Sequence, residues 1–324
     1  MSNKEVILQA DGMILGGEKQ EDGTWQFIYE DEVVHTWTGA LRILSRYPWQ
    51  TLSPVAVHPE FRFLVWREIE KAGCTLDKWR ALCGIDEVAA LADWIANSVY
   101  TVVLTGAGMS TESGVPDFRS QRGLWTKYDP FTVSHIDTLE KDYGAFQEFY
   151  SYRMRELKKV KPNAGHRVLA RWQKHDIVKY LATQNVENLH QRAGSVNVAH
   201  LHGGLEMIRC HICHSAASKE AFIEKELCMA CGGQLRPDIV LFGEPLPQDI
   251  WHAAFQEIEK SDLLLIIGTS LQVAPVNQLP RAAGGRVALI NLDETPFDSE
   301  FDLVIRGKAA EVLLETDKLL RQAE

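Results

Sequence analysis

Downstream of residue 85, short apolar runs alternate with longer segments in which apolar residues recur at helical spacing. The short runs are rich in β-branched residues and carry almost no charge, as is typical of strands buried on both faces; they are Thr101–Thr105, Val178–Thr183, Leu263–Gly268 and Val287–Asn291. The longer segments predict helices at Asp86–Ala96, Ala164–Lys174 and Asp249–Lys260. This alternation is typical of an α/β fold with a doubly wound, Rossmann-like parallel sheet covered by helices on both faces.

Residues 1–84 have a different pattern, which predicts a small α+β N-terminal extension. The turn-forming pair Asp22-Gly23 lies between two predicted strands, Val6–Ala10 and Trp25–Glu30, and two helices are predicted at Glu60–Ala72 and Leu76–Leu82. Five of the nine tryptophans fall here: Trp25, Trp37, Trp49, Trp66 and Trp79. A small packed core is the default interpretation of this aromatic density, and a peptide-binding surface is the alternative. No motif assigns it an activity, so we expect two domains, an extension of unknown role (1–84) and a catalytic domain (85–324).

Composition narrows the classes of partner. The chain has 324 residues, of which 45% are hydrophobic and 24% charged, as in ordinary globular proteins. The formal net charge of −10 argues against a large nucleic-acid surface and mildly favours a cationic peptide. The longest purely apolar run, Leu263–Ile267, is five residues, too short to span a membrane. The start, MSNKEVILQADG, lacks the order of a signal peptide, so we expect a cytoplasmic protein, with the oligomeric state left open.

Four of the six cysteines form two CxxC pairs, Cys210/Cys213 and Cys228/Cys231, separated by fourteen residues. Each CxxC pair bends the chain so that its two thiolates point to one site, and two pairs complete a tetrahedral set. The spacing therefore predicts a structural Zn²⁺ in an insert at about 206–235. A redox CxxC is the alternative. The neighbouring His211 and His214 are interpreted as solvated, and Cys74 and Cys83 stand apart.

A small-residue turn, Gly106-Ala107-Gly108, follows the first predicted strand of the α/β region. Glycines at this place allow a close approach of the backbone to a phosphate, and the following helix presents free N–H groups to the anion. Thr111 stands where the third glycine of a dinucleotide fingerprint would be, so the pattern alone also fits a tight turn in some other α/β protein.

Further motifs carry a family resemblance. The segments GAGMSTESGVPDFRS, TQNVENLHQRAGS, HLHG, the four-cysteine insert, PDIVLFGEPLP, GTSLQVAP and INLDETP occur in the order found in the sirtuins. The resemblance extends from about Ile85 to the C-terminus, roughly three quarters of the chain. It implies an NAD-dependent protein-lysine deacylase that consumes NAD as a co-substrate, transfers the acyl group to ADP-ribose and releases nicotinamide. The implied partner is an acylated-lysine protein or peptide.

The resemblance also implies roles for single residues. His202 stands at the family's general-base position, where an imidazole suits proton transfer near neutral pH, and Asn185 and Asp117 complete the catalytic set. Contacts with NAD are implied for Gly106, Ala107, Gly108, Ser110, Asp117, Phe118, Arg119, Gln184, Asn185, Glu187, Gly268, Thr269, Ser270, Asn291, Asp293 and Ala309. The stretch Ile239–Glu244 resembles the family's peptide-binding strand, with Val240, Phe242 and Gly243 as substrate contacts. We expect His190 and His200 to be structural.

Acyl specificity remains open at this point. Tyr150 and Arg153 reproduce the Tyr-x-x-Arg spacing of sirtuins that remove succinyl and malonyl groups, and one helical turn would place both on one face. Against this, Thr111 stands where those enzymes carry Ala, Asp117 follows the deacetylase pattern, and Arg153 could simply be an exposed arginine on an amphipathic helix. We therefore place deacetylation first. Two departures from the family pattern are Glu187 in place of Asp and Asp293 in place of Glu.

Two rival functions remain. An ADP-ribosyltransferase or NAD hydrolase could use the same pocket and would release nicotinamide without an acyl-lysine peptide. A non-catalytic NAD-sensing scaffold could act through residues 1–84. Retention of His202, Asn185 and Asp117 weighs against the scaffold, because binding alone requires no base.

Overall fold

The computed structural model describes residues 5–10, 13–20, 22–44, 56–57, 61, 87–118 and 129–323. The chain divides into two compact units, Met1–Asp86 and Glu87–Glu324, and each is described by itself. Several sequence-based expectations lie outside the described residues, namely the helices at Glu60–Ala72 and Leu76–Leu82, Arg119, Cys74, Cys83, Trp49, Trp66 and Trp79.

The N-terminal unit contains an antiparallel sheet of five strands in the order β4-β3-β2-β1-β5. Its elements are β1 (Glu5–Ala10), β2 (Met13–Lys19), β3 (Trp25–Tyr29), β4 (Glu32–Val34), α1 (Trp37–Leu44) and β5 (Ala56–Val57). Both predicted strands are present, and Asp22 stabilises the turn before β3 by accepting hydrogen bonds from the amide and hydroxyl of Thr24 at 2.9 and 2.6 Å. The rings of Trp25 and Phe27 pack edge-on against Phe61, so the described aromatic residues contribute to a small core.

The second unit is built on a six-stranded sheet in the order β14-β13-β12-β6-β7-β8, and every neighbouring pair is parallel. The strands are β6 (Thr101–Thr105), β7 (Val178–Thr183), β8 (Val198–His200), β12 (Leu263–Ile267), β13 (Arg286–Asn291) and β14 (Leu303–Arg306). All residues of β6 and β12 are buried, as the charge-free run of β6 and the purely apolar run of β12 predict.

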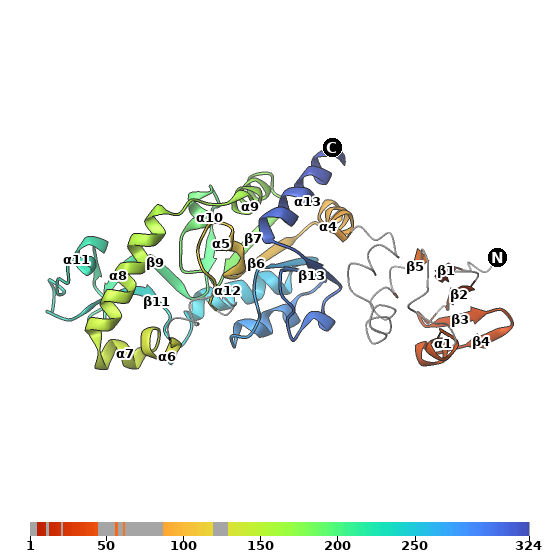
Figure 1. Ribbon diagram of the computed structural model, residues 1–324, viewed down its shortest axis with the longest axis horizontal. Coiled ribbons are helices and arrows are strands. Elements are labelled where there is room, and N and C mark those ends of the chain that lie inside the picture. Colours follow the sequence, from red (N-terminus) through yellow and green to blue (C-terminus); the bar gives the residue numbers. More distant parts are fainter. Residues whose placement is uncertain are drawn as a thin grey trace. The chain divides into compact units, whose positions relative to one another are not determined.

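Helices cover both faces of this sheet (Figure 1). One face packs against α4 (Glu87–Asn97), α9 (Ala164–Lys174) and α13 (Ala309–Ala323), and the other against α12 (Gln248–Glu259) and the 3-10 helix η4 (Val276–Ala282). Short segments complete the unit: α5 (Gly108–Thr111), α10 (Leu189–Arg192) and η5 (Asp298–Glu300). The predicted Rossmann-like α/β class is therefore confirmed. Among the described helices, none combines the length and the apolar character needed to span a bilayer.

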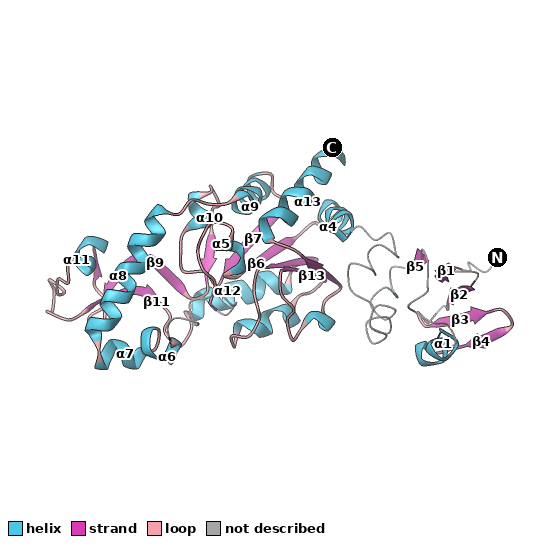
Figure 2. Ribbon diagram, viewed as in Figure 1, coloured by secondary structure: helices cyan, strands magenta, loops and turns pink. Residues whose placement is uncertain are grey.

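A smaller module lies at one end of the sheet (Figure 2). It pairs β9 (Gly203–Cys210) with β10 (Ala216–Ala217) and β11 (Leu235–Ile239) in an antiparallel sheet. Its helices are α6 (Pro130–Val133), α7 (Ile136–Lys141), α8 (Tyr143–Lys159) and α11 (Lys219–Ile223). One apolar cluster joins the helices to the small sheet and includes Phe146, Tyr150, Phe222 and Leu235.

The order of the strands locates a crevice. From β6 the chain adds β7 and β8 on one side, whereas from β12 it adds β13 and β14 on the other. The topological switch point therefore lies between β6 and β12. Ligands of open α/β sheets bind outside the carboxyl ends of the strands at such a point.

Candidate functional site

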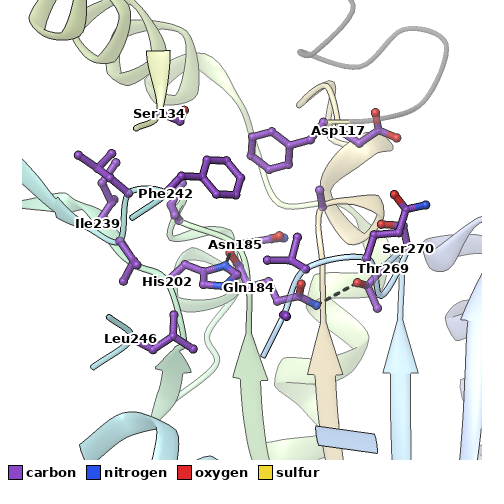
Figure 3. Close-up of a pocket in the computed structure, with 18 of the residues that line it drawn as sticks. Asp117, Ser134, Gln184, Asn185, His202, Ile239, Phe242, Leu246, Thr269 and Ser270 are labelled. Atoms are coloured by element: carbon purple, nitrogen blue, oxygen red, sulfur yellow. Dashed lines mark hydrogen bonds between the residues drawn. The ribbon is translucent and has the colours of Figure 1, made fainter. Parts of the chain in front are cut away.

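A cavity of about 650 Å³ lies where the fold predicts it, lined by the segments that follow β6, β7, β11 and β12. A second cavity of about 580 Å³ shares Gly108, Asp117, Gly268, Asn291 and Asp293 with the first. The two cavities are therefore chambers of one cleft. Figure 3 shows His202 and Phe242 on one side of the larger chamber and Asp117 and Thr269 on the other.

Glycines form the floor of the cleft because two loops meet there backbone to backbone. The amide of Gly108 donates a hydrogen bond to the carbonyl of Gly268 at 2.8 Å. A Cβ on Gly108 would lie 2.8 Å from Cα of Gly268, and a Cβ on Gly106 would lie 2.6 Å from that of Thr269. Gly268 has a φ of +61°, and a Cβ there would lie 2.4 Å from the amide nitrogen of Met109. These contacts require small residues even before any phosphate is considered.

Polar side chains from three loops are linked above this floor. Gln184 Nε2 donates to Thr269 Oγ1 at 3.0 Å (Figure 3). Asn185 Nδ2 donates to Ser110 Oγ at 3.2 Å, and Ser110 Oγ donates to the carboxylate of Glu187 at 2.6 Å. Asn185, Ser110 and Glu187 are all buried. The Glu187 carboxylate thus orients Ser110, and through it the amide of Asn185.

His202 lines the larger chamber with its tautomer set by the backbone. Its Nδ1 lies 3.1 Å from the carbonyl oxygen of Gln184. Because a carbonyl only accepts, Nδ1 carries the hydrogen and Nε2 keeps a free lone pair. Burial lowers the pKa of His202, and the hydrogen bond to Gln184 opposes this only in part. The imidazole is therefore a neutral base near pH 7.

Two nearby histidines do not line either chamber. His200 Nδ1 donates to the carbonyl of Asn185 at 2.9 Å, and the buried His190 holds Nε2 3.0 Å from Thr105 Oγ1. His200 thus supports the loop after β7 and His190 contacts the end of β6, as expected of structural residues.

The segment after β11 forms the wall beside His202. The amide of Val240 donates to the carbonyl of His202 at 2.9 Å. The amide of Phe242 donates to the carbonyl of Ser134 at 2.8 Å, and its carbonyl accepts from the amide of Ile136 at 3.0 Å. Val240, Phe242 and Gly243 all line the chamber. The wall is thereby tied both to the candidate base and to the smaller module.

Tyr150 and Arg153 of α8 also line this chamber. Arg153 is only 9% exposed, so its interpretation as a surface arginine is wrong. Its Cζ lies 5.5 Å and 5.8 Å from the ring centres of Phe118 and Phe149, and it forms no ion pair with any residue in the described part of the chain. Burial lowers the pKa of the guanidinium, whereas Tyr150 and Glu187 favour its charged form. Within the described residues, the chamber thus contains a desolvated cation without a bonded anion.

The cleft brings together most of the residues that the sequence singled out. Lining the larger chamber are Ala107, Gly108, Asp117, Phe118, Gln184, Asn185, His202, Gly268, Thr269, Ser270, Asn291 and Asp293, and Ala309 lines the second. Gly106, Ser110 and Glu187 lie behind the lining, and Arg119 is outside the described residues. Sequence reasoning assigned no role to Ser134, Trp251 or Gln272; only Gln272 belongs to a quoted motif, GTSLQVAP.

The four predicted metal ligands converge at one point. The Sγ atoms of Cys210, Cys213, Cys228 and Cys231 all lie within 4.8 Å of one another. The Cys210–Cys231 and Cys213–Cys228 sulfur separations are 3.5 and 3.6 Å, too long for disulfides and close to the roughly 3.8 Å edge of a tetrahedron with Zn–S bonds of about 2.3 Å. The thiolate set fits a structural Zn²⁺. His214 lies outside it and accepts a hydrogen bond from Arg209 instead.

Comparisons with known proteins agree with this geometry. The Sir2 family model matches residues 106–275. The NAD-dependent protein deacetylase of Oceanobacillus iheyensis is 45% identical over 219 residues, 66% of this chain and 93% of that protein. NAD-dependent protein deacetylase 1 of Geobacillus kaustophilus is 45% identical over 239 residues, 72% of this chain and 99% of that protein.

Solved structures show the same likeness. A Sir2 homologue in complex with NAD has a TM-score of 0.68 and 40% identity, and the match covers 72% of this chain and 94% of that one. A complex of Sir2 with p53 peptide and NAD⁺ has a TM-score of 0.65 and 34% identity, with 72% and 97% covered.

Proposed function

The chain belongs to the Sir2 family, and we propose that it is an NAD-dependent protein-lysine deacylase, which transfers the acyl group of a lysine side chain to ADP-ribose and releases nicotinamide. One observation carries this proposal: the neutral base His202, the glycine floor and the wall Val240–Gly243 border one chamber. A protein that only binds NAD has no need of the base.

Some of the cleft residues bind the two substrates, and His202 transfers a proton. A bound NAD would supply the reacting ribose carbon, which would lose its bond to nicotinamide and gain a bond to the acyl oxygen of the substrate. The floor at Gly108 and Gly268 gives the dinucleotide close access to the backbone. Asn185, oriented through Ser110 and Glu187, would hold a carboxamide at the inner end.

His202 supplies the base. Its Nε2 accepts a proton from a ribose hydroxyl, and its Nδ1–H remains bonded to Gln184, so the imidazolium that forms keeps the orientation of the neutral ring. His202 is half-buried in the lining of the chamber, which withdraws part of the imidazole from bulk water. Cys210, Cys213, Cys228 and Cys231 would hold a Zn²⁺, which would then have no open position and would serve to stabilise the smaller module.

Deacetylation is the first activity that we propose, and removal of an acidic acyl group is the second. The observation that favours the second is the buried guanidinium of Arg153, which lines the chamber beside Tyr150. An arginine placed there can bind a carboxylate bidentately. Thr111, which weighed against this activity, lines the second chamber and not the one that contains Arg153.

One experiment separates these activities. Nicotinamide release from NAD is measured with an acetyl-lysine peptide, a succinyl-lysine peptide and no peptide, using the full chain. Peptide-dependent release supports deacylation, and equal release without peptide would instead indicate an NAD hydrolase. Arg153→Met should reduce release with the succinyl peptide by at least ten-fold, the loss expected of one charged hydrogen-bonding group, and should spare the acetyl peptide.

Arg155→Met is the matched control, because Arg155 lies two residues further along α8 with an exposed side chain. If Arg153→Met and Arg155→Met affect both peptides alike, Arg153 does not recognise the acyl group.

A further inference from the structure

Arg236 is an arginine with no exposed surface, and it is the second residue of β11. Arginines are almost never fully buried without a partner. Its partner is Glu244, which binds the guanidinium in a fork: Nη1 lies 2.6 Å from Oε1 and Nη2 lies 2.8 Å from Oε2. Burial alone would raise the pKa of Glu244, but hydrogen bonds from Arg236 and the amide of Leu241 hold it below its usual range. The pair is therefore a charged one.

Besides a hydrogen bond from Nε of Arg236 to the carbonyl of Pro237 at 3.3 Å, the remaining hydrogen bonds of the pair go to the backbone of one segment. Nη2 of Arg236 also donates to the carbonyl of Ile239 at 2.7 Å, and Oε2 of Glu244 accepts from the amide of Leu241 at 2.9 Å. The amide of Glu244 donates to the carbonyl of Leu241 at 3.0 Å, across a turn in which Gly243 has a φ of +90°. The ion pair thus closes the segment Ile239–Glu244 on itself.

That closed segment is the wall of the larger chamber, and every residue from Ile239 to Glu244 lines it. The wall is also tied outward, by the amide of Val240 to the carbonyl of His202 and by the backbone of Phe242 to Ser134 and Ile136. These outward bonds fix the backbone at Val240 and Phe242. The ion pair fixes it at Ile239 and Leu241 and so shapes the turn of the segment. None of the residues of the glycine floor contacts the pair through a hydrogen bond in the part of the chain that the structure describes.

We propose that Arg236 and Glu244 are positioning residues for the acyl-peptide substrate: their ion pair shapes the strand Ile239–Glu244 to accept the peptide and has little effect on the NAD floor. The inference rests on the proposed deacylase function. It differs from a simple stabilising role, because a buried ion pair whose only task is to neutralise its own charges can be replaced by apolar residues of similar volume.

The test compares three variants. Glu244→Gln removes the charge but keeps the shape, and the double variant Arg236→Met/Glu244→Leu removes both charges and both sets of backbone hydrogen bonds. Glu300→Gln is the matched control, because Glu300 also binds an arginine in a fork, to Arg281 at 2.8 and 2.7 Å, but on the exposed surface. Binding of an acetyl-lysine peptide is measured by fluorescence anisotropy and binding of NAD by calorimetry, with KM and kcat for both substrates.

We expect the double variant to bind NAD within about two-fold of the wild type and to bind the peptide about ten-fold more weakly, as for the loss of one or two charged hydrogen bonds. Glu244→Gln should also weaken peptide binding and so raise the KM for peptide. Glu300→Gln should leave the affinities for peptide and for NAD unchanged. If Glu244→Gln does not fold, the double variant decides alone. Wild-type peptide affinity in the double variant, or equal losses for both ligands, would overturn the inference. Because binding is measured without turnover, absence of deacylation by the wild type would refute the proposed function separately.

Discussion

Replacing His202 by asparagine tests the chemistry of the cleft most directly. The Nδ2 amide of asparagine can donate to the carbonyl of Gln184, which now accepts from the imidazole at 3.1 Å, but it offers no basic nitrogen. A positioned general base contributes about 10²- to 10⁴-fold in rate, equivalent to about 3–5 kcal/mol of activation free energy. We therefore expect His202→Asn to lose acyl transfer by at least a hundred-fold while retaining NAD affinity.

His202→Ala separates the two roles of the imidazole. It removes the base and also leaves the Gln184 carbonyl without its donor, a loss of about 1 kcal/mol in the free energy of unfolding. The alanine variant should thus be as inactive as the asparagine variant and less stable. Single-turnover acyl transfer, calorimetry with NAD and urea unfolding measure the three quantities.

The pH profile supplies the internal control. Because burial lowers the pKa of His202 below the ordinary value of 6.5, the base is already unprotonated at pH 7. The wild-type kcat/KM should be level at neutral pH and should fall as the pH drops through the lowered pKa. This acid limb should disappear in His202→Asn. If His202→Asn kept more than a tenth of the wild-type rate, or if its kcat/KM fell at low pH as in the wild type, another group would be the base.

Three further predictions follow from the packing. Gly268→Ala places a Cβ 2.4 Å from the amide nitrogen of Met109 at a φ of +61°. Backbone strain alone should lower the free energy of unfolding by about 1–2 kcal/mol, and the NAD affinity measured by calorimetry should fall more than ten-fold. Unchanged NAD affinity would contradict the role of Gly268 in the floor of the cleft. Burial lowers the pKa of His166 from 6.5 to about 4, so unfolding takes up a proton below pH 6.5. The free energy of unfolding should therefore fall toward pH 4, by about 2 kcal/mol at pH 5. Urea unfolding at pH 7.5 and pH 5 measures this fall, which should be smaller in a His166→Asn variant. Removing Zn²⁺ with a chelator should melt the cluster that contains Cys210, Cys228 and Phe222, lowering the melting temperature and peptide turnover together; full activity at zero metal content would refute a structural role.

The parts of the fold that the sequence predicted best are those decided by local pattern. The bounds of β6 and β7 match the predicted runs, because strands of a covered parallel sheet are rich in β-branched and other apolar residues. The paired CxxC spacing likewise predicted the cysteine cluster. The strand β2 was missed because its sequence, MILGGEK, contains Gly16 and Gly17, and its stability comes from pairing with β1 and β3.

The parts that the sequence did not predict depend on contacts between distant segments. Nothing local shows that Arg153 is buried, since α8 packs on the small sheet and borders the cleft at once. The Arg236–Glu244 pair joins residues eight apart without a recognisable motif. The contact between Gly108 and Gly268 explains the glycines of two motifs, and sequence reasoning had connected only one of them with phosphate.

The floor of the cleft and the two residues of α8 that line the larger chamber, Tyr150 and Arg153, belong to different packing units. Gly108 and Gly268 constrain each other, so neither position admits a larger residue alone. Tyr150 and Arg153 extend from a helix in the core of the smaller module, and they can change without disturbing that contact. A single substitution at Tyr150 or Arg153 could therefore change the acyl specificity and leave the dinucleotide site unchanged.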